Sequence, residues 1–221
     1  MEIKGYKDFY KQDKLSIYNM DNMELMKQIP DKYFDLAIVD PPYNISCGSS
    51  TKIKKKDLEW DSKPPTKEYF LELIRISENQ IIWGGNYMSL NIPFNSTHSI
   101  IWNKENGNSF ASDCEIAFTS YKKNTTKMFN LFWIGNMMKS YEKPLIHPTQ
   151  KPISLYSWIL EKYAKEGMKI FDSHLGSGSN AIACHYAKME FIGCELDSDY
   201  YNDSVKRIRE NTRQLSLLNL E

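Results

Sequence analysis

Apolar runs of strand length alternate along the chain with stretches in which apolar residues recur at helical spacing. The runs Leu15–Asn19 and Phe34–Val39 have the length and composition of strands. Between them Asp21 precedes a helical stretch and Glu24 follows three residues later, which is close to a capping box. Further strands are expected at residues 80–83, 98–102, 115–120, 127–134, 168–172 and 190–194, and further helices at 66–78, 152–165, 179–188 and 198–212. This alternation predicts a mainly parallel sheet with helices on both faces.

The length of 221 residues corresponds to one domain, and no internal repeat divides it, so we expect a single domain over residues 1–221. A hydrophobic fraction of 41% and a charged fraction of 25% exclude a disordered or collagen-like chain. We find neither an apolar run long enough for a membrane span nor the apolar core of a secretory signal. No two of the four cysteines are spaced as C-x-x-C, which disfavours a zinc ribbon. The sequence therefore predicts a reduced cytoplasmic protein (the host cytoplasm for a phage-encoded chain) with no membrane partner and no metal.

Positive charge gathers in two segments, although the chain has 28 basic and 28 acidic residues. Residues 48–67 carry six lysines and three acids, and residues 120–151 carry six lysines and one acid. Tryptophans such as Trp60 and Trp133 lie in or beside these segments, a pattern that favours a nucleic-acid surface but also occurs on solvated faces. The lysines expected to contact phosphates are Lys52, Lys54, Lys55, Lys56, Lys122, Lys123 and Lys139.

A glycine turn separates the strand expected at 168–172 from the helix expected at 179–188. Gly176 and Gly178 permit positive φ angles and the close approach of a ligand to the backbone. Glu195 lies 19 positions after Gly176, at the end of the next strand, where an acid can bind ribose hydroxyls. This context favours an adenosine-type cofactor, either NAD or S-adenosylmethionine. The turn lies close to the C-terminal end of the sequence, where a second dinucleotide-binding half cannot follow, and this disfavours NAD.

The strand Phe34–Val39 leads directly into Asp40-Pro41-Pro42-Tyr43. The two prolines fix φ and donate no hydrogen bonds, so the local carbonyl groups stay free as acceptors. An extruded base needs acceptors for its exocyclic amine and an aromatic ring on which to stack. Asp40 and the carbonyl of Pro41 would accept the amine protons, and Tyr43 would supply the ring. The alternative is a rigid loop exit with a capping aspartate.

Three motifs in this order resemble the amino-methyltransferases of DNA, and more narrowly their β group, in which the catalytic loop precedes the cofactor turn. The motifs are Asp40–Tyr43, His147-Pro-Thr-Gln-Lys-Pro152 and Phe171-Asp-Ser-His-Leu-Gly-Ser-Gly178. The resemblance, which extends from about Ser16 to Ile208, implies a Rossmann-like S-adenosylmethionine-dependent methyltransferase fold. That fold is α/β, with a mostly parallel seven-stranded sheet, helices on both faces and a permuted motif order.

The resemblance also implies site-specific methyl transfer from S-adenosylmethionine to adenine N6 in double-stranded DNA, by base flipping and direct in-line attack. Cytosine N4 or RNA as the substrate, and a non-catalytic DNA-binding homologue, remain alternatives. A restriction-modification partner, an orphan methylase and a phage-encoded protective enzyme fit the sequence equally well.

Site residues follow from the resemblance position by position. The catalytic residues are Asp40, Pro41, Pro42 and Tyr43. The cofactor-binding residues are Asp21, Asp40, His147, Thr149, Lys151, Phe171, Asp172, Ser173, His174, Leu175, Gly176, Ser177, Gly178, Asn180, Glu195 and Leu196. Within this set the segment that contains His147, Thr149 and Lys151 would meet the methionine part of the cofactor, beside the free N–H groups of a helix N-terminus. Ser173 and His174 depart from the family, whose turn usually has Pro and Phe there, and this could alter affinity or the methyl pocket.

Further segments would complete such an enzyme. Residues 44–66 combine Gly, Ser, Lys and a proline pair and predict a long mobile loop. Residues 120–146 would form a small target-recognition excursion. Asn86 and Tyr87 follow another strand and would line the same pocket, unless they form a plain strand exit. Enzymes of this group often form homodimers, to which Ile92–Phe94 would contribute.

Overall fold

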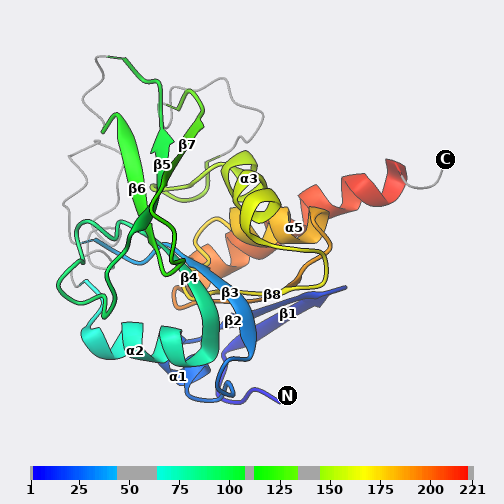
Figure 1. Cartoon of the computed structure of the whole chain (residues 1–221). Helices are drawn as coiled ribbons and strands as arrows, with labels where there is room; N and C mark the ends of the chain where they lie inside the picture. Colours follow the sequence, from blue (N-terminus) through cyan, green and yellow to red (C-terminus); the bar gives the residue numbers. More distant parts are fainter. Residues whose placement is uncertain (1, 44–63, 108–111, 134–144, 219–221) are drawn as a thin grey trace.

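The computed structural model describes residues 2–43, 64–107, 112–133 and 145–218, and one sheet of nine strands crosses them (Figure 1). The strands are β1 (Asp8–Gln12), β2 (Leu15–Asn19), β3 (Phe34–Val39), β4 (Ser77–Trp83), β5 (His98–Asn103), β6 (Cys114–Thr119), β7 (Thr126–Asn130), β8 (Lys169–Asp172) and β9 (Glu190–Glu195). The helices are α1 (Asn22–Met26), α2 (Lys67–Ile76), α3 (Ile153–Tyr163), α4 (Ser179–Tyr186) and α5 (Ser198–Leu218). In space the strands follow the order β1-β2-β9-β8-β3-β4-β6-β5-β7.

The expected seven-stranded, mostly parallel sheet is wrong in detail, because the sheet is mixed and has nine strands in the described residues. The neighbours β2, β9, β8, β3 and β4 pair in parallel. At one end β1 pairs antiparallel with β2, and towards the other β6 runs antiparallel to both β4 and β5. The sequence pattern missed β1 because Asp8 and Lys11 are exposed there and Tyr10 alone is buried.

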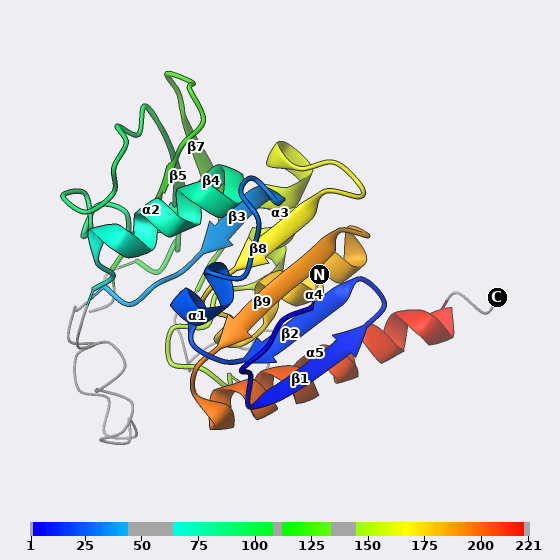
Figure 2. The ribbon, with the colours of Figure 1, turned by 90° about the horizontal axis from the view of Figure 1, so that it is seen from below.

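Helices cover both faces of the sheet, as expected. Figure 2 shows α1 and α2 in front of the sheet and α4 and α5 behind it, and α3 packs against α4. The two faces have separate hydrophobic cores because successive side chains of a strand point in opposite directions. In β3, Leu36 and Ile38 join the core under α3, α4 and α5, whereas Ala37 and Val39 join the core under α1 and α2. A strand buried on both faces explains the continuous apolar run in the sequence.

The strands β3 and β8 lie side by side in the sheet, paired through Leu36 with Ile170 and Ala37 with Phe171. From β3 the chain continues through α2 to β4 on one side, and from β8 it continues through α4 to β9 on the other. The carboxyl ends of β3 and β8 therefore form the point at which the strand order reverses. In open α/β sheets, ligands bind in the crevice at this point, and Asp40 and the glycine turn both begin here.

Two expectations stay open. Ile92 is buried and Phe94 packs partly buried against the same core as α2, whereas Pro93 between them is exposed, so a contribution of Ile92–Phe94 to a homodimer stays a prediction. The described residues do not include 44–63 of the predicted mobile loop or 134–144 of the predicted excursion. The described part of the excursion contains β7, which pairs in parallel with β5. No helix in the described part of the chain is long and apolar enough to cross a membrane.

Candidate active site

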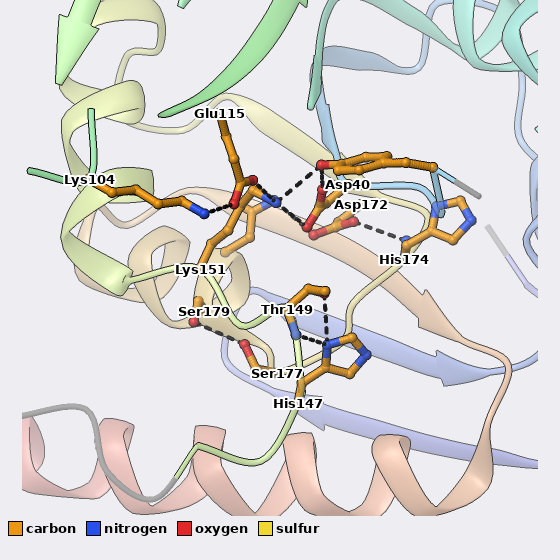
Figure 3. A network of polar contacts seen from close by, with 12 residues as sticks. Asp40, Lys104, Glu115, His147, Thr149, Lys151, Asp172, His174, Ser177 and Ser179 are labelled. Carbon is orange, nitrogen blue, oxygen red and sulfur yellow. Dashed lines mark hydrogen bonds and ion pairs between the residues drawn. The ribbon is translucent and has the colours of Figure 1, made fainter. Parts of the chain in front are cut away.

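The first corner of the crevice is the loop after β3, where Asp40 meets Lys151 (Figure 3). The Lys151 Nζ lies 2.5 Å from Asp40 Oδ2 and 3.3 Å from the Tyr43 hydroxyl, which itself donates to Asp40 Oδ1. The Lys151 side chain is only 2% exposed and that of Asp40 17%. The carboxylate at the end of β3 is therefore held by an ammonium group at one oxygen and a phenol at the other.

Glu115 and Lys104 extend this contact into a line of alternating charges. Lys151 Nζ lies 3.0 Å from Glu115 Oε2, and Glu115 Oε1 lies 2.6 Å from Lys104 Nζ. Glu115 reaches the crevice because β6 runs antiparallel to β4, which brings the beginning of β6 to the edge where β3 and β4 end. We call Asp40, Lys151, Glu115 and Lys104 the charge line. Two acids and two lysines make it neutral overall, which a buried ionic cluster requires.

The pKa values in the charge line follow from burial and from these neighbours. Burial raises the pKa of Asp40, Lys151 opposes this, Glu115 adds to it, and the net pKa lies above the ordinary carboxyl value. Burial also acts to raise the pKa of Glu115, but Lys151 and Lys104 outweigh it and the net pKa is lowered. Burial acts to lower the pKa of Lys151, yet Asp40 and Glu115 raise it, so Lys151 stays charged.

Two glycines after β4 make room for the aromatic part of this corner. A Cβ atom on Gly84 would lie 2.1 Å from the Tyr43 ring, and one on Gly85 would lie 2.5 Å from Phe118, so no larger residue fits without a shift. Gly84 also has a φ of 65°, which favours glycine. Tyr87 is 51% exposed and stacks on Tyr43 with ring centroids 5.5 Å apart. The strand exit after β4 therefore shapes the position of Tyr43, and the pocket wall at Asn86 and Tyr87 stays a prediction.

The second corner is the glycine turn between β8 and α4. Gly176 and Gly178 take φ angles of 52° and 75°, and Gly178 is the N-cap of α4. At the end of β9, Glu195 accepts hydrogen bonds from the N–H groups of Gly176 and Asp197, both at 3.0 Å. Beside it Leu196 is 57% exposed. A partly exposed carboxylate next to a glycine turn is the arrangement that ribose recognition requires.

Asp172 supports this turn from below, where it is 2% exposed. Its Oδ1 accepts from the N–H of His174 at 3.0 Å, and its Oδ2 accepts from Asn180 Nδ2 at 3.1 Å. Asn180 also donates to the carbonyl of Ile38 in β3, at 3.2 Å. Burial raises the pKa of Asp172 to about 7, against which these two hydrogen bonds act. Asp172 and Asn180 therefore tie the glycine turn to the end of β3.

The two departures from the family pattern, Ser173 and His174, contact each other. Ser173 Oγ lies 2.8 Å from His174 Nδ1 and 2.6 Å from the Tyr69 hydroxyl of α2. His174 Nε2 lies 3.0 Å from Asn22 Nδ2 in α1. Burial lowers the pKa of His174 to about 4, so the imidazole is neutral at physiological pH. Ser173 and His174 thus form a hydrogen-bonded chain that links the turn to α1 and α2.

The segment before α3 joins the two corners. His147 lies beside the turn, with a ring carbon 3.7 Å from the place of a Cβ on Gly176, and it packs on Tyr200 with ring centroids 4.5 Å apart. Thr149 Oγ1 is 3.2 Å from His147 Nδ1. Lys151, two residues further on, points to Asp40 instead. The structure thus brings His147 and Thr149 to the turn, whereas the Lys151 ammonium is engaged by Asp40 and Glu115.

Three of the remaining predicted cofactor residues line or support the turn, and the fourth, Asp21, caps α1. Phe171 is fully buried and packs on Phe34 with ring centroids 4.9 Å apart, so it supports the turn from the core. Leu175 and Ser177 are buried within the turn itself. Asp21 caps α1 by accepting from the N–H groups two and three residues ahead, at 2.8 and 3.1 Å. The available carboxylate, backbone and polar groups fit an adenosine-type cofactor, and in the described residues no cluster of His, Cys, Asp or Glu could hold a metal ion.

The lysines predicted to contact phosphates fall into two groups. Lys52, Lys54, Lys55, Lys56 and Lys139 lie outside the described residues. Lys122 and Lys123 follow the end of β6, where Ser120 N donates to the carbonyl of Gln80 in the middle of β4. Because β6 runs antiparallel to β4, this end of β6 points away from the edge at which Asp40 follows β3. Phosphate contacts by these two lysines stay a prediction.

Four residues of the site were missed by sequence reasoning: Lys104, Glu115, Asn22 and Tyr69. Glu115 gave a signal, since it is an acid at the start of an apolar strand, but an exposed strand end explains such a residue equally well. Tyr69 is one of two buried aromatic residues of α2, beside Phe70, and nothing in its spacing distinguishes it. The signal that finds these residues is the antiparallel course of β6 and the packing of α2, which are tertiary features.

Comparison with known proteins matches this arrangement. Residues 78–206, more than half of the chain, match the model of a family described as DNA methylase, which covers N6 and N4 types. The type II methyltransferase M2.DpnII of Streptococcus pneumoniae is 24% identical, over 91% of this chain and 92% of that protein. The crystal structure of the M1.HpyAVI–SAM complex has a TM-score of 0.60 at 19% identity, over 88% of this chain and 98% of that one. PvuII DNA methyltransferase, which is cytosine-N4-specific, has a TM-score of 0.62 at 13% identity, over 93% of this chain and 94% of that one. The structures share the fold, the expected family is confirmed, and the chain belongs to the DNA methylase family.

Proposed function

We propose that the protein transfers the methyl group of S-adenosylmethionine to adenine N6 at a specific site in double-stranded DNA. The observation that carries this proposal is the position of Asp40-Pro41-Pro42-Tyr43 at the reversal point of the sheet, next to the glycine turn. The similarity to a type II methyltransferase supports site specificity. A cytoplasmic location, with access to the genome, is part of the proposal.

In the glycine-turn corner, Glu195 would accept hydrogen bonds from ribose hydroxyls, and the backbone at Gly176 would allow close approach. His147 and Thr149 would meet the amino-acid end, near the N-terminus of α3. When bound, S-adenosylmethionine supplies a methyl group on a positively charged sulfur. The chain's own contribution is to fix that group relative to the catalytic corner, which is where positioning yields rate.

In the catalytic corner, Asp40 and the carbonyl of Pro41 would accept the two amine protons of the extruded base, and Tyr43 would stack on it. This orients the nitrogen lone pair for direct attack, without a covalent enzyme intermediate. The nitrogen becomes positive as its new bond forms, and it then loses a proton. Asp40, whose pKa burial raises, is placed to accept that proton directly or through water.

Expression of the wild type and of Asp40→Ala in a methylation-deficient host tests the proposal. DNA and RNA from both cultures are digested to nucleosides and analysed by mass spectrometry. The expected result is N6-methyladenine in DNA with the wild type and background with Asp40→Ala. Background levels with the wild type would contradict the proposal.

Cytosine N4 is the second candidate, because a cytosine-N4-specific enzyme has the same fold. In the family that the chain resembles, an aspartate at the head of the catalytic loop is typical of adenine-N6 enzymes and a serine of cytosine-N4 enzymes. Asp40 therefore favours adenine. N4-methylcytosine in the same digest would select this candidate, and methylated nucleosides in RNA alone would identify RNA as the substrate. A chain that binds DNA without any transfer would be a non-catalytic homologue.

A further inference from the structure

Glu115 stands outside the three motifs that carry the proposed chemistry, yet it shares a lysine with the catalytic aspartate. The Lys151 ammonium lies 2.5 Å from Asp40 and 3.0 Å from Glu115, between the two carboxylates (Figure 3). On its other side Glu115 contacts Lys104 at 2.6 Å. The side chains of Lys151, Lys104 and Glu115 are 2%, 13% and 23% exposed. Contacts at this depth are only weakly screened by solvent.

We propose that Glu115, held by Lys104, is a positioning residue for methyl transfer: it occupies one side of the Lys151 ammonium and so leaves Asp40 able to accept hydrogen bonds from the target amine. The inference rests on the proposed function, because it assumes that Asp40 receives an amine. It assigns Lys104 and Glu115 a role in the reaction although neither belongs to the catalytic loop or the glycine turn.

The physical reason is that one buried cation pairs with two carboxylates at once. With Asp40 as its sole carboxylate, Lys151 would pair with it exclusively, and a carboxylate bound in this way is a weaker acceptor for another donor. Glu115 also attracts the ammonium and so weakens its pairing with Asp40. Lys104 in turn neutralises Glu115, so the charge line carries no net charge into the interior. Removing the charge of Glu115 or of Lys104 changes the field at Asp40 in a predictable direction.

Asp40 has titratable neighbours on every element that packs against it. Tyr43 lies on its own loop, Lys151 lies before α3, and Glu115 lies on β6. Asp172 at the end of β8, Tyr69 of α2 and Tyr156 of α3 also interact with it electrostatically. Burial raises the pKa of both tyrosines, so they stay neutral. Within the described residues around Asp40, Lys151 is thus the cation in contact and Glu115 the acid that shares it.

This arrangement predicts opposite effects for two substitutions that remove one charge each, an isosteric one at Glu115 and a nearly isosteric one at Lys104. Glu115→Gln removes a negative charge and lowers the pKa of Asp40. Lys104→Met removes a positive charge further along the line and raises it. Shifts on the order of 0.5–1 unit are expected for charges at these separations. A merely structural role would produce no shift, or shifts of the same sign from loosened packing.

The test is a titration of ¹³C-labelled aspartate carboxyl groups by NMR, with the Asp40 signal assigned by its loss in Asp40→Asn. It is run on the wild type, Glu115→Gln, Lys104→Met and the conservative Glu115→Asp, each checked for a cooperative thermal transition. We expect a lower pKa of Asp40 in Glu115→Gln, a higher one in Lys104→Met, and a value close to the wild type in Glu115→Asp.

The pH profile of transfer to duplex DNA supplies the second readout. In Glu115→Gln the acid limb should move to lower pH and kcat should fall about tenfold, with little change in the KM for S-adenosylmethionine. Unchanged or same-sign pKa shifts would overturn the inference. A wild type that transfers no methyl group would contradict the proposed function instead, and the NMR titration would still decide how Glu115 and Lys104 act on Asp40.

Discussion

The two corners of the crevice both contain buried carboxylates, but they stabilise them by different means. In the catalytic corner, Asp40 is paired with the Lys151 ammonium 2.5 Å away. In the glycine-turn corner, Asp172 and Glu195 are held by backbone N–H groups and an amide. The pKa of Asp172 accordingly rises to about 7, because hydrogen bonds from neutral groups offset burial less than a full charge does. The same residue type therefore serves as a charged acceptor in one corner and as a structural tie in the other.

The largest expected effect comes from breaking the catalytic corner at Asp40. Asp40→Ala should lower kcat for methyl transfer by about 10²- to 10⁴-fold, because the acceptor of the target amine is lost. Glu195→Gln, the matched change in the other corner, should chiefly raise the KM for S-adenosylmethionine. Initial rates with a radiolabelled methyl donor and duplex DNA measure both. Equal effects of the two variants on kcat would contradict the division between corners.

Removing the Lys151 ammonium from the catalytic corner should lower the free energy of unfolding. Lys151→Met leaves Asp40 and Glu115 buried without the ammonium between them and should destabilise the fold by about 3–5 kcal/mol. Urea unfolding measures the change. Lys162→Met is the control, since Lys162 is 44% exposed and pairs with Glu161 at 3.6 Å. That surface substitution should cost less than about 1 kcal/mol, and similar losses for both variants would refute the buried pair.

In the glycine-turn corner, Asp172 should make the free energy of unfolding depend on pH. The folded-state pKa of Asp172, about 7, lies above the ordinary value of 3.8, so the folded protein holds a proton that the unfolded chain has lost. Stability from this group is therefore fully present below pH 4 and declines as the pH rises to about 7, by at most about 4 kcal/mol. Asp40 and Glu195 also titrate, so the difference between the wild type and Asp172→Asn isolates the contribution. A difference independent of pH would show that Asp172 has the same pKa in the folded and the unfolded chain.

The smallest effect concerns the contact between the turn and α2. Tyr69→Phe removes one hydroxyl that lies 2.6 Å from Ser173 Oγ and should cost about 1 kcal/mol of unfolding free energy. Because His174 is neutral, this loss should be the same at pH 5 and pH 8. A loss confined to low pH would mean that His174 is protonated in the fold. Chemical denaturation at the two pH values provides the comparison.

The sequence predicted the residues at the ends of parallel strands, but it did not predict Glu115 and Lys104, and the reason is physical. Asp40 and Gly176 follow strands and Glu195 ends one, and the carboxyl ends of parallel strands meet at one edge, so the strand pattern placed them together and the resemblance supplied their roles. Glu115 and Lys104 reach the same edge because β6 runs antiparallel, a feature that an apolar run does not encode. The same reversal directs the end of β6 that precedes Lys122 and Lys123 away from this edge. The exposed side chains of β1 likewise concealed a ninth strand.

Methylation-sensitive sequencing of the genome of an expressing host tests the central claim most directly, because it reports activity, base and sequence context together. Cells that express the wild type should carry N6-methyladenine at one short recurring sequence, and cells that express Asp40→Ala should not. Absence of modified adenine with the wild type, or modification scattered without a sequence context, would contradict a site-specific adenine-N6 methyltransferase.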